Sequence, residues 1–307
     1  MKAYYCDHFV LPLPAGHRFP MAKYARLRAR VAQAAPTLGI ELVEPEEAGI
    51  DDLERAHDRD YVRRVSDGGL SPAEVRRIGF PWSPAMVSRS RRSSGGTIGA
   101  LRAALAGDGV GVNLAGGTHH AFANQGGGYC VFNDTVVAAR HVQAHGLARR
   151  LLVIDLDVHQ GDGTAAICAG DDSIWTLSLH GERNYPATKQ RSDLDVPLRD
   201  GCGDDEYLAA LAGALAIAVP AARADAAIFL AGADPYAGDR LGHLALSREG
   251  LAARDRLVFD TCRSHHLPVA VTMAGGYAED VDEIVGIHFA TVAAAAASAA
   301  AWAGSRV

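Results

Sequence analysis

Blocks of apolar and polar residues alternate along this chain and predict short strands separated by helices. The strand candidates are aliphatic and β-branched runs of the length expected in a buried sheet; they span residues 3–6, 40–43, 110–114, 151–157, 174–179, 226–231 and 269–273. The helix candidates carry apolar residues at helical spacing; they span residues 23–35, 134–145, 204–219, 248–264 and 279–301. This alternation is typical of an α/β fold with a doubly wound parallel sheet.

Two of the predicted helices carry clear end signals. Pro36 and Gly39 are expected to stop the first helix. Asn133 or Asp134 is suited to cap the start of the second, and Gly146 supplies a left-handed residue just beyond its end. These signals support the helical assignment independently of the apolar spacing.

A cluster of polar residues and glycines follows five of the seven predicted strands. These clusters are residues 116–120, residues 157–162, residues 178–180, Asp234 and residues 275–277. In an open parallel sheet, ligands bind beyond the carboxyl ends of the strands. Five loops are therefore expected to converge on one site.

The composition favours one soluble globular domain over residues 1–307. Hydrophobic residues make up 49% of the chain and charged residues 21%, and no repeat, linker or composition break divides it. Five scattered cysteines without a CxxC pair argue against a disulfide framework and against a cysteine zinc site. They are Cys6, Cys130, Cys168, Cys202 and Cys262.

Charge and terminal sequence narrow the partners. The formal net charge of −6 argues against nucleic acid, and we expect the arginines of residues 26–30 and 89–92 to lie on solvated helix faces. The first ten residues lack the apolar core of a signal peptide, which predicts a cytoplasmic protein. The alanine-rich stretch at residues 291–303 is too short and too weakly apolar to span a membrane, so no membrane partner is expected.

The segment LLVIDLDVHQGDGT, residues 151–164, has the features of a metal site. Asp155, Asp157 and His159 alternate along an extended chain, so their side chains point to one side. At about 3.3 Å per residue, Asp155 and His159 lie roughly 13 Å apart and cannot share an ion. Asp157 and His159 are therefore the expected ligands, while Asp155 is expected to support them. Glycines on either side of Asp162 allow a turn that returns a third carboxylate.

Asp234, in the segment FLAGADPY, is the natural third ligand. Two carboxylates and one imidazole leave one position of a tetrahedral zinc ion open, which is a catalytic arrangement. An aspartate before a proline is otherwise commonly a turn residue, and only its place at a strand end favours ligation.

His119 and His120, in LAGGTHHAF, follow two glycines that allow close backbone approach to a ligand. Two histidines can divide acid and base work, and a carboxylate partner fixes the tautomer of each. Asp155 and Asp162 are the available partners. The alternative is an accidental pair among 13 histidines. We assign His141, His145, His243, His265, His266 and His288 to helix surfaces and loops.

Tyr277, in MAGGYAE, stands behind another glycine pair at a strand end. Its phenol is placed to donate a hydrogen bond to a developing oxyanion. A half-buried structural tyrosine is the more common explanation of such a residue taken alone.

Six motifs together resemble the histone deacetylase family of zinc amidohydrolases, in the same order and over most of the chain. They are GGTHHAF, GGGYCVFND, DLDVHQGDGT, LSLHG, LAGADPY and AGGY. HRFPMAKY near the start and YPATKQRSDLDVPL after His180 are closest to the class IV branch and its bacterial relatives. GGTHH stands where many members have a proline and a third histidine. The resemblance implies an arginase-like fold with eight parallel strands and helices on both faces.

The resemblance also implies roles for individual residues. It makes Asp157, His159 and Asp234 the ligands of one zinc per chain, and Tyr277 the residue that polarises the carbonyl. His119 and His120 match the family's paired histidines, with Asp155 and Asp162 behind them. Asp155, Asp157, His159, Ser178 and Leu179 match a structural potassium site. Gly128, Tyr129, Tyr185 and Gly275 match the walls of a narrow substrate tunnel.

The implied activity is metal-assisted hydrolysis that removes an acetyl or longer acyl group from a lysine side chain or a related primary amine. An arginase-type ureohydrolase with two manganese ions shares the fold, but its pattern needs a histidine between two aspartates where this chain has DLDVH. A non-catalytic protein that binds acyl-lysine is the other alternative. The sequence leaves open the substrate, whether protein, polyamine or small molecule, and the oligomeric state.

Overall fold

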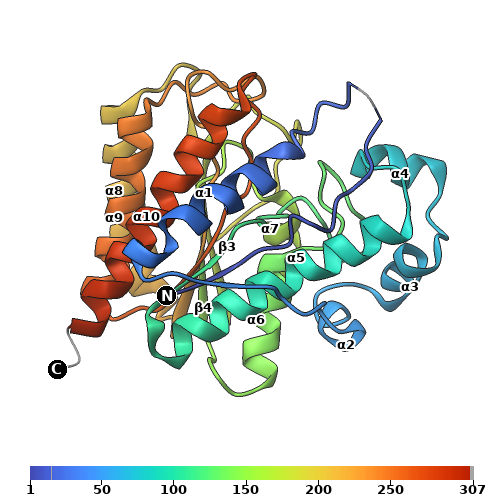
Figure 1. Cartoon of the computed structure of the whole chain (residues 1–307), viewed down its shortest axis with the longest axis horizontal. Helices are drawn as coiled ribbons and strands as arrows, with labels where there is room; N and C mark the ends of the chain where they lie inside the picture. The colour runs from blue at the N-terminus through green and yellow to red at the C-terminus, as the bar shows by residue number, and fades with distance from the viewer. Residues whose placement is uncertain (15, 305–307) are drawn as a thin grey trace.

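The computed structural model describes residues 1–14 and 16–304, which form an α/β fold around one eight-stranded, all-parallel sheet (Figure 1). The strand order is β2-β1-β3-β8-β7-β4-β5-β6. The strands are β1 Lys2–Tyr4, β2 Glu41–Val43, β3 Val110–Asn113, β4 Leu151–Asp155, β5 Ile174–Gly181, β6 Leu194–Leu198, β7 Ala226–Leu230 and β8 Val269–Thr272. The eight-stranded α/β architecture expected from the sequence is therefore confirmed.

Helices cover both faces of the sheet, as Figure 1 shows. One face is packed by α1 Ala22–Leu38, α8 Asp204–Ala222, α9 Arg248–Ser264 and α10 Val281–Gly304. The other face is packed by α5 Pro84–Ala103 and α6 Asp134–Ala144. The remaining turns of helix are α2 Ile50–Leu53, α3 Arg59–Asp67, α4 Pro72–Ile78, the π-helical η1 Ala104–Asp108 and α7 Asp162–Cys168.

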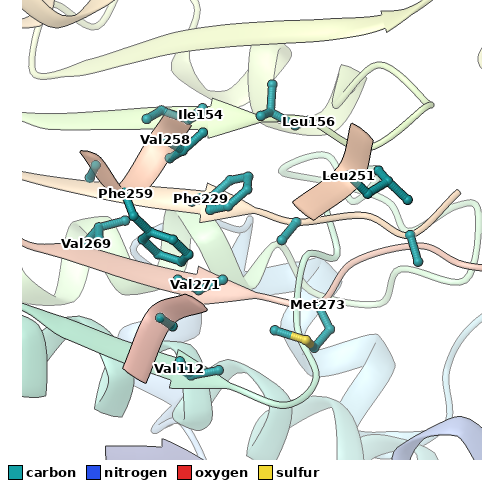
Figure 2. Packing of buried hydrophobic residues seen from close by; sticks show 14 of the residues in the cluster. Val112, Ile154, Leu156, Phe229, Leu251, Val258, Phe259, Val269, Val271 and Met273 are labelled. Atoms are coloured by element: carbon teal, nitrogen blue, oxygen red, sulfur yellow. The ribbon is translucent and has the colours of Figure 1, made fainter. Parts of the chain in front are cut away.

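The central strands are apolar at nearly every position because they are buried on both faces, and polar residues such as Asp155, Asn113 and Thr272 stand at their carboxyl ends. In β4, Leu152 and Ile154 join the core beneath α8 to α10, whereas Leu151 and Val153 join the core beneath α5 and α6. Figure 2 shows the first of these cores, where Phe229 of β7 meets Phe259 of α9 at a ring distance of 6.0 Å and an angle of 78°. This is the edge-to-face geometry that aromatic pairs favour.

The apolar pattern missed the edge strand β6. Its sequence, LDVPL, includes Asp195 and Pro197, and its burial is only partial. Proline is tolerated in an edge strand because one side of that strand donates no ladder hydrogen bonds. A half-exposed edge strand therefore lacks the continuous apolar run that identifies the others.

The prediction that Pro36 stops α1 is wrong, because the helix continues to Leu38. Gly39, in the left-handed conformation with φ 62°, ends the helix instead, and its N–H donates to Ala35 O. One missing N–H close to a helix end costs a single hydrogen bond, so the last turn persists around Pro36.

The longest helix of the second face, α5, was also missed. Glycines at three of its positions weaken the helical pattern, but they allow close packing. A Cβ at Gly95 would lie 1.9 Å from Glu46 O, and a Cβ at Gly99 would lie 2.5 Å from the Tyr4 ring. Arg89, expected on a solvated face of this segment, is buried and donates to Cys6 O and Phe9 O.

Two other assignments to the surface are wrong. His141 on α6 and His288 on α10 are both buried. The expectation that the alanine-rich stretch at residues 291–303 is too short to span a membrane is wrong for the helix that contains it, α10. Helices α8 and α10 reach that length and composition, although core helices of soluble proteins do so too, and both pack against the sheet.

Candidate active site

A cavity of about 440 Å³ opens at the carboxyl ends of the strands, within the range typical of small-molecule sites. Its walls come from the loops after β3, β4, β5, β7 and β8, from the end of α4, and from Phe19 and Tyr24 at the start of α1. Three of the five predicted clusters line it, and Asp234 lies directly behind them. Ser178 and His180 are buried but do not line the cavity.

Asp157, His159 and Asp234 form a buried cluster at the floor of this cavity, with ligand atoms within 4.8 Å of one another. His159 Nδ1 lies 2.9 Å from Asp157 Oδ1 and 3.3 Å from Asp234 Oδ2. Two carboxylates and one imidazole thus converge from loops that are 75 residues apart in the sequence. The cluster is the metal site that the sequence predicts.

The charges of the cluster suit a divalent cation. Burial and the neighbouring Asp157 raise the pKa of Asp234 to about 7, because two buried carboxylates repel each other. Burial opposes protonation of His159, but Asp157 and Asp234 outweigh it and raise its pKa to about 10. Asp234 Oδ2 makes no hydrogen bond within the described chain. A cation with oxygen and nitrogen ligands would satisfy this oxygen.

Gly275 is required by the packing of this cluster. A Cβ at this position would lie 1.8 Å from Asp234 Oδ2 and 2.6 Å from Asp157 Oδ2. The Gly275 N–H instead donates to Asp157 Oδ2 at 2.7 Å. The residue thus supports the metal ligands as well as lining the cavity.

Each of the paired histidines contacts the carboxylate expected as its partner. His119 Nδ1 lies 2.7 Å from Asp155 Oδ2, and His120 Nδ1 lies 2.6 Å from Asp162 Oδ1. Both rings line the cavity, and their centroids are 4.1 Å apart. Because Nδ1 of each ring is engaged, Nε2 is left for chemistry in the cavity.

The surroundings move the pKa values of the two histidines in opposite directions. Burial would lower the pKa of His119, but Asp155 and Asp157 outweigh it and raise it to about 9. Burial and the charge of His119 lower the pKa of His120 to about 4, against the effect of Asp162. Two groups whose pKa values are shifted in opposite directions can serve as the acid and the base of one site.

Tyr277 is buried, lines the cavity, and places its ring 6.4 Å from that of His159. Two consecutive residues of the loop after β7, Asp239 and Arg240, hold its backbone. The Tyr277 N–H donates to Asp239 Oδ2 at 2.6 Å, and its carbonyl accepts from Arg240 Nε at 2.9 Å. These two residues were not identified from the sequence, and AGDRLG, which follows the Asp234 loop, is the segment that carries them.

Lys23 was also not identified as a residue near the site. Its Nζ donates to Ala274 O at 3.2 Å and lies 5.6 Å from the centre of the Tyr277 ring. Burial lowers the pKa of Lys23 to about 8, although Asp234 and Asp157 oppose the shift. The lysine belongs to the HRFPMAKY motif, so that motif places a buried cation beside the segment that carries Tyr277.

The remaining predicted wall residues also lie at the cavity. Tyr129 and Tyr185 both line it, and the Tyr185 ring meets the His120 ring edge-on at 4.8 Å. Gly128 adopts φ 53°, and a Cβ there would lie 2.6 Å from His120 Cδ2. Glycine at 128 is thus needed for the close approach of the wall to His120.

Asp134 fixes the loop that carries the paired histidines. Its carboxylate accepts hydrogen bonds from Gly117 N, Thr118 N and the Thr97 hydroxyl. Asn133 caps α6 through Val136 N, as expected. The Asn133 N–H donates to His57 Nε2 at 2.9 Å, so a histidine far away in the sequence supports this corner of the site.

His57 predicts a loss of stability in mild acid. Its Nδ1 pairs with Phe122 O while Nε2 accepts from Asn133, which fixes the neutral form. Burial lowers its pKa to about 4, although the carbonyls of Phe122 and Ala123 and the charge of Asp58 oppose the shift. Between the unfolded value near 6.5 and the folded value, only the unfolded chain binds the proton. Stability should therefore fall over that range, by up to about 3 kcal/mol from this residue.

Urea unfolding at a series of pH values, for wild type and a His57→Asn variant, would check this. The variant should start less stable by about 1–3 kcal/mol, and should lose less stability between pH 6.5 and 4.5. Equal losses in both proteins would show that His57 is not the group responsible.

The residues of the predicted potassium site lie on or just beyond neighbouring strands. Asp155 of β4 and Ser178 of β5 are paired in the sheet register, followed by Leu179 on β5 and by Asp157 and His159 beyond β4. Their proximity is compatible with a cation site, which stays a prediction.

Comparison with known protein families identifies a match to the histone deacetylase domain over residues 17–292. An uncharacterized protein of Picosynechococcus is 43% identical over 92% of this chain and 94% of its own length. Histone deacetylase 2 of Arabidopsis thaliana is 30% identical over 88% of this chain and 72% of its own length.

Two solved structures share the fold at lower identity. The crystal structure of the HDA15 HD domain matches with a TM-score of 0.80 and 22% identity, over 95% of this chain and 90% of the other. The acetylpolyamine aminohydrolase of Burkholderia pseudomallei matches with a TM-score of 0.75 and 20% identity, over 96% and 98%. At these identities the likeness concerns the fold.

Proposed function

Since the chain belongs to the histone deacetylase family, we propose that it is a zinc-dependent amidohydrolase that removes acetyl or other acyl groups from lysine side chains or related primary amines. One observation carries the proposal. The buried cluster of Asp157, His159 and Asp234 lies at the floor of a cavity that two histidine–carboxylate pairs and a tyrosine also line.

Asp157, His159 and Asp234 would hold one zinc ion, which when bound supplies a Lewis acid for amide hydrolysis. His120 accepts the proton of the attacking water, which fits its lowered pKa. His119, or the two histidines jointly, donates a proton to the leaving amine. Tyr277 donates a hydrogen bond to the oxyanion that develops on the carbonyl.

The walls favour a slender substrate. Tyr129 and Tyr185 present aromatic surface to an unbranched acyl-amine chain, which binds mainly by apolar contact. Gly128 and Gly275 line the cavity without adding side chains to it. Acetylated lysine and acetylated polyamines both have a chain of this shape.

Two rival functions have simple tests. A binuclear ureohydrolase needs a second metal cluster, and the described residues contain one candidate cluster. About one zinc per chain favours the deacylase, whereas two manganese ions per chain favour the ureohydrolase. A protein that only binds acyl-lysine would show no turnover of any acylated amine.

The class within the family, a second cation and the cellular location of the protein are part of the same proposal. Membership of class IV is supported by HRFPMAKY and by YPATKQRSDLDVPL, which carries Gln190 and Asp195, the two partners of the buried Gln160. A structural potassium ion between β4 and β5 and a cytoplasmic location are also proposed.

An assay of the purified protein against acyl-lysine peptides and acylated polyamines tests the function, with released acid as the readout. Turnover of none of them would refute it.

Tyr277→Phe should lower kcat on the order of a hundredfold to a thousandfold, because one preorganised oxyanion donor is lost. KM and the zinc content should change little, since the ring and the flanking glycines remain. Kinetics and melting temperature on one preparation would check this. A structural tyrosine would lower the melting temperature instead and leave kcat within about twofold of wild type.

A further inference from the structure

Two arginines stand at the mouth of the cavity. Arg76 and Arg77 end α4, and both are exposed while lining the cavity. Among the residues that the structure describes, Asp157, one of the metal ligands, is the only carboxylate in the lining. The mouth is therefore cationic in a chain whose formal net charge is −6.

Arg77 is fixed relative to the tunnel wall. Its carbonyl accepts the Gly128 N–H at 3.1 Å, and the next carbonyl, that of Ile78, accepts the Tyr129 N–H at 2.8 Å. The guanidinium donates through Nη1 to Gln125 Oε1 at 2.7 Å. One side of this guanidinium is thereby anchored, and its other N–H groups are left for a ligand.

Gly127 brings Arg77 close to the aromatic wall. A Cβ built on Gly127 would lie 3.6 Å from Arg77 Cγ and 3.7 Å from the Tyr185 hydroxyl. The arginine stem and the Tyr185 hydroxyl therefore both lie within 4 Å of one point beside this glycine. Arg77 and Tyr185 thus belong to the same part of the cavity wall.

Nearby carboxylates do not neutralise the mouth. Glu74, on the same helix, is held by Arg64 and by Ser71. Asp200 lies 3.7 Å from His243, which lines the mouth, but also 3.3 Å from Arg183. Arg76 forms no ion pair within the part of the chain that the structure describes.

We propose that Arg76 and Arg77 form an anion-binding subsite, and that the substrate of this cavity carries a carboxylate a few atoms from the amide that is cleaved. The inference rests on the proposed function and narrows its substrate class. Arginine binds carboxylates through two parallel hydrogen bonds. Acetylated polyamines and lysine-rich peptides would instead place ammonium groups next to two guanidinium groups. Because like charges repel, these compounds should be poorer substrates.

The test compares peptides that contain one acetyl-lysine flanked by glutamate, by glutamine or by lysine. At about 50 mM salt, kcat/KM should be at least about tenfold higher for the glutamate peptide than for the lysine peptide. Raising the salt to about 500 mM should shrink this ratio, because exposed charges are then screened. An acetylated polyamine should be hydrolysed more slowly than the glutamate peptide.

Reversing the charge of the two arginines tests whether they cause the preference for the glutamate peptide. The double variant Arg76→Glu plus Arg77→Glu should invert the ratio, and Arg76→Glu alone should lower it if the double variant fails to fold. Arg256→Glu on α9 makes the same change of charge as Arg76→Glu at an exposed position outside the cavity lining, and should leave the ratio unchanged. A wild-type preference for lysine or glutamine flanks, or a ratio that survives the reversal, would overturn the subsite.

The anion-binding subsite and the deacylase function can be refuted independently of each other. If no peptide is hydrolysed, the deacylase function fails, while binding of the same labelled peptides, followed by fluorescence polarisation, still decides the subsite. Tighter binding of the glutamate peptide by wild type than by the Arg76→Glu variant would support it. Equal binding of all three peptides would overturn it.

Discussion

Replacing Asp234 by alanine is expected to empty the metal site and reduce hydrolysis to background. Asp234 is fully buried, and its Oδ2 lies 3.3 Å from His159 Nδ1 with no hydrogen bond of its own. Even a residue that only supports a metal ligand contributes about 10- to 100-fold in metal affinity, so the loss of a direct ligand should exceed that. Wild type should contain about one zinc per chain.

Elemental analysis and activity on one preparation would check this result. Asp172→Ala removes the same charge at an exposed position remote from the cavity, and should keep metal and activity. Circular dichroism of the Asp234→Ala variant separates loss of the ligand from loss of the fold. A full zinc content in that variant would contradict the ligand assignment.

His120→Ala is expected to lower kcat by about 10²- to 10⁴-fold, the usual contribution of a general base, and to leave zinc bound. The ring lines the cavity and is oriented by Asp162, but it contributes no atom to the buried metal cluster. The effect should therefore fall on turnover, with little change in metal content.

Kinetics together with zinc analysis would test this division of roles. His265→Ala, at an exposed position at the end of α9, serves as the matched control and should behave as wild type. Loss of zinc from His120→Ala would make that histidine a ligand. A decrease of less than about tenfold would remove it as the base.

Strands buried on both faces were predictable from the sequence, because such a strand is a nearly continuous apolar run. The central run Leu151–Asp155 is an example, and its observed end differs from the prediction by two residues. The edge strand β6 and the glycine-containing helix α5 were not predictable in this way. Their residues meet solvent or closely packed backbone, so no apolar period marks them.

The candidate site was predictable where chemistry demands particular side chains at strand ends. Asp157, His159 and Asp234 come together as expected. Asp239 and Lys23 were not predictable, because each acts on a backbone atom of a segment distant in sequence. Every residue offers the same backbone groups, so a hydrogen bond to the backbone requires no particular side chain in the partner segment. The sequence of that segment therefore gives no sign of the contact.

The hydrogen bonds around residues 274–277 also have an entropic consequence. Lys23 holds the carbonyl of Ala274, Asp157 holds the N–H of Gly275, and Asp239 holds the N–H of Tyr277. Ordering a free residue costs roughly 1–2 kcal/mol, and this segment is ordered before any substrate arrives. Little chain entropy is then left to lose on binding, so more of the favourable contact energy can appear as affinity.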